Sequence, residues 1–263
     1  MHHFAVIGNP IKHSLSPDIH QQFAKQFNLD ITYKKILSPL DKFSETIDEL
    51  RKAGINGVNI TIPFKQNAFQ YANECTKRAI NAGAVNTFIF KDNQCIGDNT
   101  DGIGFIRDLE NKKISLKNKR ILILGAGGAA QGIIPALKTQ SPKQIAILNR
   151  TEKKALKITS MFNCDIFKKD RPYDLLINTT NADFENADYF NEICNLSNLD
   201  CYDLNYGDRH YSFKKWAQSR NAKSCHDGFG MLVEQAAESF YLWTGMKPDT
   251  AYVLDIGGAE VES

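Results

Sequence analysis

A glycine-rich turn at residues 125–130 limits the possible folds of this chain more than any other feature. The turn reads Gly-Ala-Gly-Gly-Ala-Ala, follows the apolar run Ile121–Leu124 and begins a stretch with a helical pattern. A strand, a G-x-G-x-x-A turn and a helix in this order bring backbone N–H groups against a pyrophosphate, and glycine lets the backbone approach closely. The pattern therefore predicts a dinucleotide site, with contacts from Gly125, Ala126, Gly127, Gly128 and Ala129.

The next β-rich run indicates which dinucleotide binds. Residues 144–148 end at Asn149-Arg150-Thr151, about where a Rossmann fold contacts the ribose. An NAD site places Asp or Glu there, whereas the guanidinium of Arg150 can pair with a 2′-phosphate. Glu152 supports the competing NAD interpretation, but it lies past the strand end and is expected to face solvent. We therefore predict NADP(H), held near the ribose by Asn149, Arg150, Thr151 and Lys154.

The length of 263 residues exceeds one typical compact core and favours two domains. Short β-rich runs alternate with helical patterns along the chain, which is typical of α/β folds with open, largely parallel sheets. We expect a substrate-binding catalytic domain at residues 1–102 and a Rossmann-type cofactor domain at residues 103–237, with a cleft between them. The final stretch, residues 238–263, is expected to form a helix that packs back on the first domain.

Composition and charge exclude several classes of partner. Apolar residues make up 42% and charged residues 24% of the chain, as in an ordinary globular enzyme, and the net charge is only +2. Because no long basic block or membrane-length apolar run occurs, we expect neither a nucleic-acid nor a membrane partner. The N-terminus enters a strand directly, without the pattern of a signal peptide, which favours a cytoplasmic protein. Monomer and homodimer both remain open.

The cysteines are widely scattered, with no C-x-x-C pair and no histidine at zinc-finger spacing. This arrangement favours reduced thiols in the cytosol and predicts no metal site. The six positions are Cys75, Cys95, Cys164, Cys194, Cys201 and Cys225.

Polar side chains lie in and just beyond the third expected strand. Residues 57–62 alternate apolar side chains with Asn59 and Thr61, so this polar pair is expected on one face, and Lys65 follows just beyond. Ligands in open α/β sheets bind outside the carboxyl ends of the strands, so these three residues are candidates for a site. In the plainer interpretation, Asn59 and Thr61 are only the wet face of a strand.

Further polar residues of the first half follow the same pattern. Ser14 and Ser16 come after the first expected strand, Asn86 lies inside the apolar strand 84–90 where its amide needs partners, and Asp101 lies in a turn. Ser16 alone could be a helix N-cap, and Asp101 alone a turn or N-cap residue. Together these groups suit a small molecule that carries hydroxyl groups and a carboxylate.

Two other stretches end near the expected site. Tyr206 ends the expected strand 200–206, and Gly228 and Met231 precede the helical run 233–243. Gln235 lies off the apolar stripe of that helix, so the pattern alone favours an exposed glutamine.

Taken together, the chain resembles shikimate dehydrogenases of the aromatic amino-acid pathway over nearly its whole length. Seven motifs in the family's order carry the resemblance: Gly8-Asn9-Pro10-Ile11 with His13-Ser14-Leu15-Ser16-Pro17, Asn59 to Lys65, Gly83 to Thr87, Gly97 to Gly102, the glycine turn, Asn149-Arg150-Thr151, and Asp227 to Leu232 with Gln235. The resemblance implies the reversible reduction of 3-dehydroshikimate to shikimate by NADPH.

The resemblance also implies a role for each candidate residue. Lys65 and Asp101 would be the catalytic pair, in which a nearby ammonium stabilises the charge that develops on the ketone oxygen and supplies a proton. Gly228 to Met231 would place the nicotinamide. Ser14 and Ser16 would hold the substrate carboxylate, Asn59, Thr61, Asn86, Asp101 and Gln235 its hydroxyls, and Tyr206 would lie on the substrate side.

Two stretches depart from the family pattern. Residues 178–183 lack the glycine expected in an Asn-Ala-Thr-Ser-x-Gly turn and add Asp183, and Tyr211-Ser212 stands where many members have Thr-Pro. These departures affect the expected loop contacts and cofactor affinity rather than Lys65 or Asp101. Two alternatives remain: a quinate/shikimate dehydrogenase with broader substrate and cofactor use, and a non-catalytic NADPH-binding protein.

Overall fold

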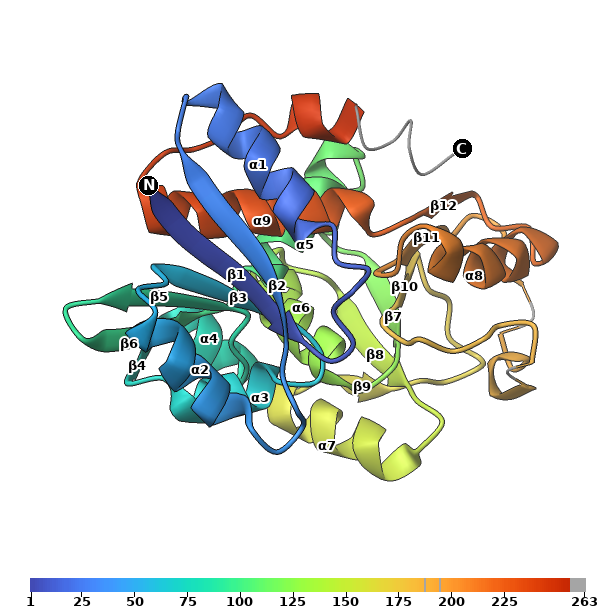
Figure 1. The fold of residues 1–263 in the computed structure, drawn as a ribbon. Helices are drawn as coiled ribbons and strands as arrows, with labels where there is room; N and C mark the ends of the chain where they lie inside the picture. The colour runs from blue at the N-terminus through green and yellow to red at the C-terminus, as the bar shows by residue number, and fades with distance from the viewer. Residues whose placement is uncertain (187, 194, 256–263) are drawn as a thin grey trace. The chain divides into compact units, whose positions relative to one another are not determined.

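The computed structural model describes residues 1–186, 188–193 and 195–255 (Figure 1). The chain divides into two compact units, one formed by Met1–Gly104 with the segment from Leu232 onward, the other by Phe105–Met231. These divisions fall inside helices α5 (Asp101–Asn111) and α9 (Phe229–Thr244), where the sequence pattern shows no break. Residues 256–263 of the expected C-terminal helix lie outside the described residues.

The first unit contains a six-stranded mixed sheet. Its strands are β1 (His2–Gly8), β2 (Ile31–Leu37), β3 (Gly57–Ile60), β4 (Glu74–Cys75), β5 (Thr87–Lys91) and β6 (Gln94–Asp98). The order is β2-β1-β3-β5-β6-β4, and β1 runs parallel to β2 and β3, whereas β5 runs antiparallel to β3 and β6. The carboxyl ends of β1, β3 and β6 therefore lie at one edge of the sheet, and the segments that follow these strands carry the candidate residues.

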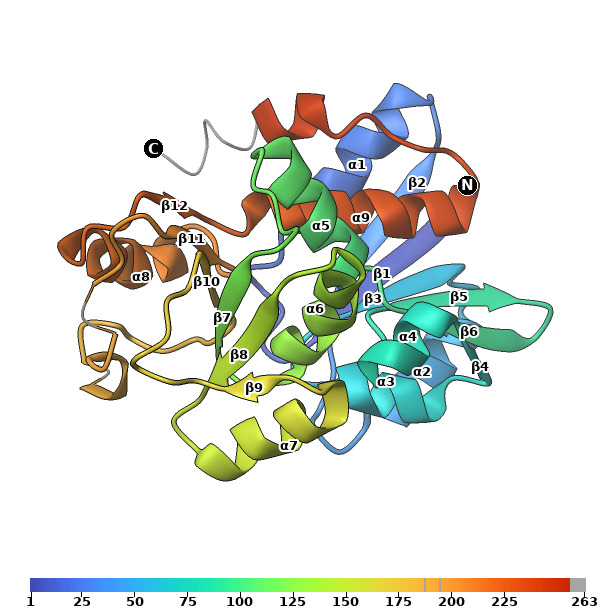
Figure 2. The same ribbon diagram turned by 180° about the vertical axis from the view of Figure 1, so that it is seen from behind.

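Helices cover both faces of this sheet (Figures 1 and 2). They are α1 (Ser16–Gln26), α2 (Phe43–Lys52), α3 (Lys65–Tyr71) and α4 (Lys77–Ala82), joined by the parts of α5 and α9 that belong to the unit. α2, α3 and α4 bury apolar side chains such as Ile47 and Ala68 against β1 and β3. On the opposite face the packing is aromatic: Phe4 stacks on Trp243 at 4.5 Å, and Phe23 meets Phe240 edge-on at 5.8 Å.

The structure differs from local interpretations of the sequence at three places in this unit, and two of these were the plainer alternatives for Ser16 and Asn59. Leu15, not Ser16, is the N-cap of α1, and Ser16 is its first residue. β3 ends at Ile60 and is buried along its whole length, so Asn59 is not on a wet face. The strand expected at residues 84–90 begins only at Thr87, because the N–H of Val85 donates instead to the carbonyl oxygen of Lys65, at 2.9 Å.

The second unit contains six parallel strands. They are β7 (Arg120–Leu124), β8 (Gln144–Leu148), β9 (Asp165–Ile166), β10 (Leu175–Asn178), β11 (Asp200–Asp203) and β12 (Ser224–His226). The order β12-β11-β10-β7-β8-β9 is the doubly wound order of a Rossmann fold, which confirms the predicted fold class. The direction of winding reverses between β7 and β10, and the glycine turn follows β7 at this switch point.

Besides the parts of α5 and α9 that belong to it, the described part of the second unit contains α6 (Gly128–Thr139), α7 (Glu152–Phe162), α8 (Asp208–Ser219) and the short 3₁₀ helix η1 (Asp188–Phe190). The strands β7, β8 and β10 read as continuous apolar runs because both of their faces are covered. β10 and β11 end at Asn178 and Asp203, where Asn178 Nδ2 donates to Asp203 Oδ1 at 2.8 Å, so β11 is shorter than the expected strand 200–206. Within the described residues, no helix combines the length and apolar character needed to cross a bilayer.

Candidate active site

The predicted pair Lys65 and Asp101 is in direct contact in the first unit. Lys65 is the first residue of α3 and Asp101 the first residue of α5, so each follows a strand that ends at the same edge of the sheet. The Lys65 Nζ lies 2.6 Å from Asp101 Oδ2, and the side chains are 19% and 7% exposed. The ammonium group can thus reach a bound molecule while its partner is shielded from water.

Asp101 is held in one orientation by its neighbours. Its Oδ1 accepts a hydrogen bond from Asn86 Nδ2 at 2.8 Å, and its backbone N–H donates to Asn99 Oδ1 at 3.1 Å. Each carboxylate oxygen therefore has its own donor, Asn86 on one side and Lys65 on the other. A fixed carboxylate fixes in turn the position of the ammonium group.

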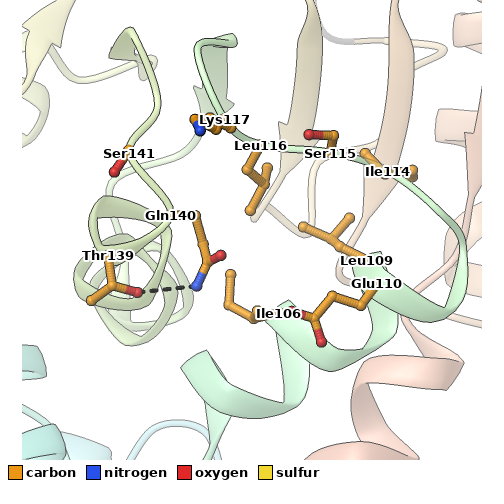
Figure 3. A pocket seen from close by; sticks show the side chains of 10 residues that line it. All are labelled: Ile106, Leu109, Glu110, Ile114, Ser115, Leu116, Lys117, Thr139, Gln140 and Ser141. Atoms are coloured by element: carbon orange, nitrogen blue, oxygen red, sulfur yellow. Dashed lines mark hydrogen bonds between the residues drawn. The ribbon is translucent and has the colours of Figure 1, made fainter.

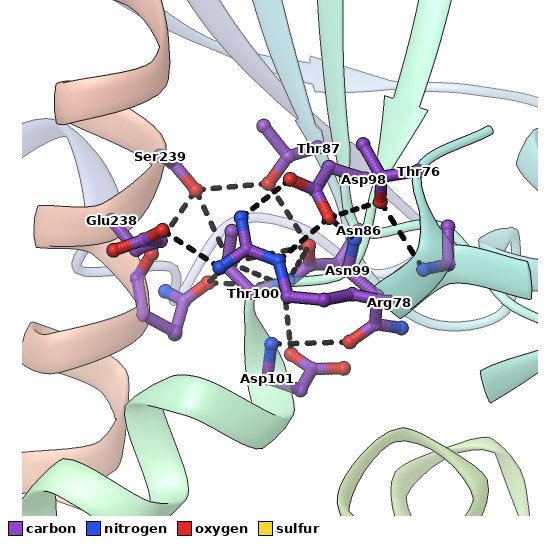
Figure 4. Close-up of polar contacts among 12 residues, drawn as sticks. Thr76, Arg78, Asn86, Thr87, Asp98, Asn99, Thr100, Asp101, Glu238 and Ser239 are labelled. Carbon is purple, nitrogen blue, oxygen red and sulfur yellow. Dashed lines mark hydrogen bonds and ion pairs between the residues drawn. The ribbon is translucent and has the colours of Figure 1, made fainter. Parts of the chain in front are cut away.

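Asn86 is buried with all of its amide in use, as its place in an apolar run predicted (Figure 4). Besides Asp101, its Nδ2 donates to Thr100 Oγ1 at 2.9 Å and to Gln235 Oε1 at 3.3 Å. Its Oδ1 accepts from Thr87 Oγ1 at 2.9 Å and from the N–H of Thr100 at 2.8 Å. Asn86 is thus the centre of the network that carries Asp101.

Gln235 is not the exposed helical glutamine that the pattern alone favoured. It is partly buried on α9, and its Oε1 also accepts from Thr100 Oγ1 at 3.3 Å. The helical stripe could not show this, because the contact depends on packing between α9 and the first turn of α5. A Cβ at Gly104 would lie only 2.6 Å from the backbone nitrogen of Gln235, so glycine permits that packing.

Asn59 has a fixed amide of the same kind. Tyr33 donates its hydroxyl to Asn59 Oδ1 at 2.7 Å, and Asn59 Nδ2 donates to Thr87 Oγ1 at 3.1 Å and Ser239 Oγ at 3.0 Å. Sequence reasoning missed Tyr33 and Ser239, since neither position breaks a local pattern. Thr61 lies just beyond β3, partly exposed, in the turn that leads to Lys65.

The two predicted serines lie side by side at the start of α1, Ser14 just before the helix and Ser16 as its first residue. Ser14 Oγ is 3.2 Å from Ser16 Oγ and accepts a hydrogen bond from the N–H of Ser16 at 3.3 Å. Behind them His20 is fully buried, and neither ring nitrogen has a hydrogen-bond partner in the described part of the chain. Burial lowers the pKa of His20 to about 3, so the ring is neutral.

The glycine turn of the second unit has the geometry of a phosphate cradle. Gly125 has φ +108°, and a Cβ there would lie 2.5 Å from Thr179 Oγ1, so this position requires glycine. Gly127 is the N-cap of α6 and Gly128 its first residue; at both positions a Cβ would point into open space. The first turn of α6 therefore presents its N–H groups to that space, and the residues fit a dinucleotide.

The ribose-side residues follow β8 as predicted from the spacing. Thr151 is the N-cap of α7, and Asn149 Nδ2 donates to the Thr151 carbonyl oxygen at 2.9 Å. Arg150 and Lys154 are exposed, and so is Glu152. Burial raises the pKa of the Tyr189 phenol, an effect that the charge of Arg150 opposes.

The remaining predicted residues lie near the end of the second unit. Tyr206 is partly buried after β11, where burial raises its pKa, and its ring meets Phe229 at 6.4 Å. Gly228 packs against the carbonyl oxygen of Leu204, and a Cβ there would overlap that oxygen. Met231 packs against the apolar core of this unit.

The segment 178–183 forms its turn without the glycine that the family pattern contains. Asn178 Oδ1 accepts hydrogen bonds from the N–H of Thr180 at 2.9 Å and from its hydroxyl at 2.8 Å. None of the residues 178–183, all of which are described, has a positive φ. The Asp183 carboxylate accepts hydrogen bonds from the N–H of Glu185 and from Asn186 Nδ2. The missing glycine is therefore compatible with this backbone.

A separate cavity of about 390 Å³ lies in the second unit, near the ends of α5 and α6 (Figure 3). It is lined by apolar side chains such as Leu109 and Leu116 and by the polar residues Lys117 and Gln140. None of the predicted site residues lines it.

Among the described residues, no group of three or more His, Cys, Asp or Glu side chains could hold a metal ion. The described cysteines are free thiols, and Cys194 lies outside the described residues. Burial raises the pKa of Cys225 to about 12.

Comparison with known proteins matches three parts of the chain. Residues 6–88 match the shikimate dehydrogenase substrate binding domain, residues 108–183 a shikimate / quinate 5-dehydrogenase family, and residues 228–256 the shikimate 5′-dehydrogenase C-terminal domain. The shikimate dehydrogenase (NADP(+)) of Vesicomyosocius okutanii is 48% identical over 97% of this chain and 98% of its own length.

Solved structures agree with this match. An Ael1 enzyme from Pseudomonas putida is 36% identical with a TM-score of 0.87, covering 97% of this chain and 98% of its own. Shikimate 5-dehydrogenase from Thermus thermophilus, solved in complex with NADP(H) and shikimate, is 30% identical with a TM-score of 0.86, covering 98% and 99%. Fold, motifs and identity over the whole length lead to one conclusion: the chain belongs to the shikimate dehydrogenase family.

Proposed function

We propose that this protein catalyses the reversible, NADPH-dependent reduction of 3-dehydroshikimate to shikimate. The reaction makes it an oxidoreductase that acts on a CH–OH group in the biosynthesis of aromatic amino acids. Family membership supports the reaction type, and the observation that carries the mechanism is the contact of 2.6 Å between Lys65 and Asp101. An intact pair of this kind argues against a protein that only binds NADPH.

Lys65 acts on the reacting oxygen. When hydride adds to the ketone carbon, the electrons of the C=O π bond move to oxygen, and the ammonium of Lys65 stabilises that charge and donates its proton. Asp101 holds the ammonium in place through Oδ2, while Asn86 holds Asp101 through Oδ1. In the direction of shikimate oxidation, the neutral amine accepts the hydroxyl proton.

Other residues of the first unit bind the substrate. The adjacent hydroxyls of Ser14 and Ser16 are suited to a carboxylate, which accepts two hydrogen bonds at once. The substrate hydroxyls are assigned to Asn59, Thr61, Asn86, Asp101 and Gln235, and the family resemblance assigns Tyr206 to the substrate as well. Because the amides of Asn59 and Asn86 are already bonded internally, part of their role is to keep the neighbouring side chains in place.

The cofactor assignment is NADP(H), which supplies or accepts the hydride when bound. The open space in front of Gly127 and Gly128 receives the pyrophosphate, and Ala126 and Ala129 complete the turn. The exposed Arg150, with Asn149, Thr151 and Lys154, binds the 2′-phosphate. Gly228 and Met231 belong to the segment assigned to the nicotinamide.

Initial rates of oxidation measured separately for shikimate and quinate, each with NADP⁺ and with NAD⁺, test this proposal. We expect shikimate with NADP⁺ to have the highest kcat/KM. A higher value for quinate with NAD⁺ would instead make the protein a quinate/shikimate dehydrogenase. The absence of turnover with all four combinations, with NADPH still bound, would leave only a binding function.

The cytoplasm stays the expected location, because the scattered cysteines lack the spacing of a disulfide framework and the described ones are free thiols. A gel-filtration measurement on the purified protein distinguishes the monomer from the homodimer.

A further inference from the structure

Arg78 on α4 links two acidic residues from different parts of the first unit (Figure 4). Its Nε and Nη2 donate to the two carboxylate oxygens of Asp98, at 3.1 and 2.6 Å, which is a bidentate contact. Its Nη1 donates to Glu238 Oε1 on α9 at 2.7 Å. A single guanidinium thus joins the end of β6 to α9, and sequence reasoning assigned no role to any of the three residues.

This arrangement is built around a buried carboxylate. The Asp98 side chain is only 1% exposed, and its Oδ1 also accepts from Thr76 Oγ1 at 2.6 Å and from the N–H of Asn99 at 2.7 Å. Burial of the Arg78 guanidinium disfavours its charge, but hydrogen bonds to Asp98 and Glu238 outweigh burial and raise its pKa. A buried ion pair is a weak source of net stability, so its value here is the geometry that it imposes.

Asp98 is linked to Asp101 of the proposed catalytic pair through Asn99. Asp98 binds the N–H of Asn99, the Asn99 side chain accepts from the N–H of Asp101 at 3.1 Å, and Asn99 Nδ2 donates to the carbonyl oxygen of Ala84 at 3.0 Å. The N–H of Asn86 also donates to the carbonyl oxygen of Asp98 at 3.0 Å. The same residue therefore supports both the backbone of Asp101 and the amide that binds its Oδ1.

The second carboxylate bound by Arg78, that of Glu238, lies on α9 and fixes the position of this helix. Glu238 lies one helical turn after Gln235 and directly before Ser239, and both of these contact the network around Asn86 and Asn59. Holding Glu238 fixes the rotation and axial position of α9 relative to β6. Gln235 is thereby kept within hydrogen-bond distance of Thr100 and Asn86.

We propose that Arg78 is a positioning residue, which sets Asp101 through Asp98 and sets Gln235 through Glu238. The inference rests on the proposed function, because its readout is the turnover of shikimate. Arg78 touches neither Lys65 nor Asp101, and it acts only through the two carboxylates. The planar fork is essential: lysine at this position keeps a positive charge but cannot bind Asp98 in a bidentate manner while also reaching Glu238.

The experiment compares Arg78→Lys and Arg78→Ala with the wild-type protein, first with shikimate varied at saturating NADP⁺ and then with NADP⁺ varied at saturating shikimate. We expect kcat to fall about tenfold or more and the KM for shikimate to rise, because small displacements of catalytic groups are costly. The KM for NADP⁺ should stay within about twofold, since the predicted cofactor residues belong to the second unit. A merely structural role would lower the amount of folded enzyme and leave both KM values unchanged.

Two further measurements make the result decisive. Added guanidinium ion at millimolar concentration should restore part of the turnover of Arg78→Ala, and it should not affect Arg78→Lys, where the cavity is filled. Glu238→Ala should raise the KM for shikimate more than it lowers kcat, because it removes the acceptor that ties α9 to Arg78 while Asp98 keeps Arg78 in place. The matched control is Arg51→Lys in the same unit, whose guanidinium donates to Tyr71 and to the carbonyl oxygen of Asn93, away from this network.

The outcomes separate cleanly. If the wild-type protein does not oxidise shikimate, the proposed function fails before the variants are compared. If the wild type is active but Arg78→Lys matches it in kcat and in KM for shikimate, the positioning role is overturned. Equal losses in Arg78→Lys and Arg51→Lys would overturn it as well, because they would show a general effect of arginine replacement.

Discussion

The two units bind their proposed ligands with different parts of the chain. In the first unit, the site consists of side chains such as Lys65, Asp101 and Asn86, which are largely buried and bonded to one another. In the second, it consists of backbone N–H groups at a glycine turn and of exposed cationic side chains such as Arg150. A side-chain network depends on many distant partners, whereas a backbone turn depends on a few adjacent residues. The effects of a substitution should therefore reach many residues of the site in the first unit, and only adjacent residues in the second.

The largest expected effect is the loss of Lys65 or of the Asp101 charge. Lys65→Ala and Asp101→Asn should each lower kcat by about 10²- to 10⁴-fold, because general acid catalysis and charge stabilisation act on the reacting oxygen. Binding of NADP⁺, measured by fluorescence titration, should change little. An unchanged kcat in both variants would refute the assigned roles.

A second prediction concerns two glycines of the same turn. Gly125→Ala should destabilise the protein by about 1 to 3 kcal/mol, because the residue has a positive φ and the new Cβ would meet Thr179. Gly127→Ala should leave stability nearly unchanged, since its Cβ points into open space, but should weaken NADP⁺ binding. Urea unfolding and cofactor titration of both variants test the contrast. Equal stability losses would show that the turn has a purely structural role.

Replacement of Arg150 should have a smaller and more selective effect. Arg150→Ala should raise the KM for NADP⁺ about tenfold, the value of one charge-assisted contact with the 2′-phosphate. The KM for shikimate and the KM for NAD⁺ should stay nearly constant. Arg171→Ala, which removes another exposed arginine of the second unit, is the control. If the KM values for NADP⁺ and shikimate rise equally, Arg150 is structural.

The smallest effect is a pH dependence of stability that comes from His20. Its pKa falls from 6.5 to about 3 on burial, so below pH 6.5 the unfolded chain takes up a proton that the folded protein does not. Stability is therefore lost as the pH falls through this window, by about 1 kcal/mol between pH 7 and 5.5.

His20→Phe should remove this loss, because the phenyl ring can keep the packing against Tyr33 without titrating. The measurement is urea unfolding of both proteins at pH 7 and 5.5. The exposed His2→Phe shows how much of any change comes from replacing a histidine at the surface. A difference between wild type and His20→Phe that does not depend on pH would contradict the burial of a neutral ring.

Sequence reasoning was more complete for the second unit, where the features are local, than for the first, where they depend on tertiary contacts. The glycine turn, the strand before it and the position of Arg150 could be read locally, because each depends on a few consecutive residues. Ser14, Lys65 and Asp101 could be proposed because they follow strands, and strands of one direction end at one edge of a sheet. Differences arose at element ends. Ser16 is the first residue of its helix and not the N-cap, and at residues 84–86 the N–H of Val85 bonds to Lys65 in place of the expected strand pairing.

The residues that sequence reasoning missed are supporting ones. Ser239 contacts Asn59 across 180 positions of the chain, and Glu238 contacts Arg78 across 160. Each is an ordinary polar residue on a helix, and no local pattern separates it from a solvated side chain. The exposed interpretation of Gln235 was wrong for the same reason.

The sequence by itself determined the α/β class and the glycine turn, and its motifs were enough to propose Arg150 for the ribose side and Lys65 and Asp101 as the catalytic pair. Each of these depends on the type and spacing of residues along a short stretch, where neighbouring residues set the backbone geometry. Only the tertiary structure decided which amides are fixed, which carboxylates share Arg78 and how α9 is held. Those features depend on hydrogen bonds between residues far apart in sequence, and such bonds form only when folding has brought the elements together.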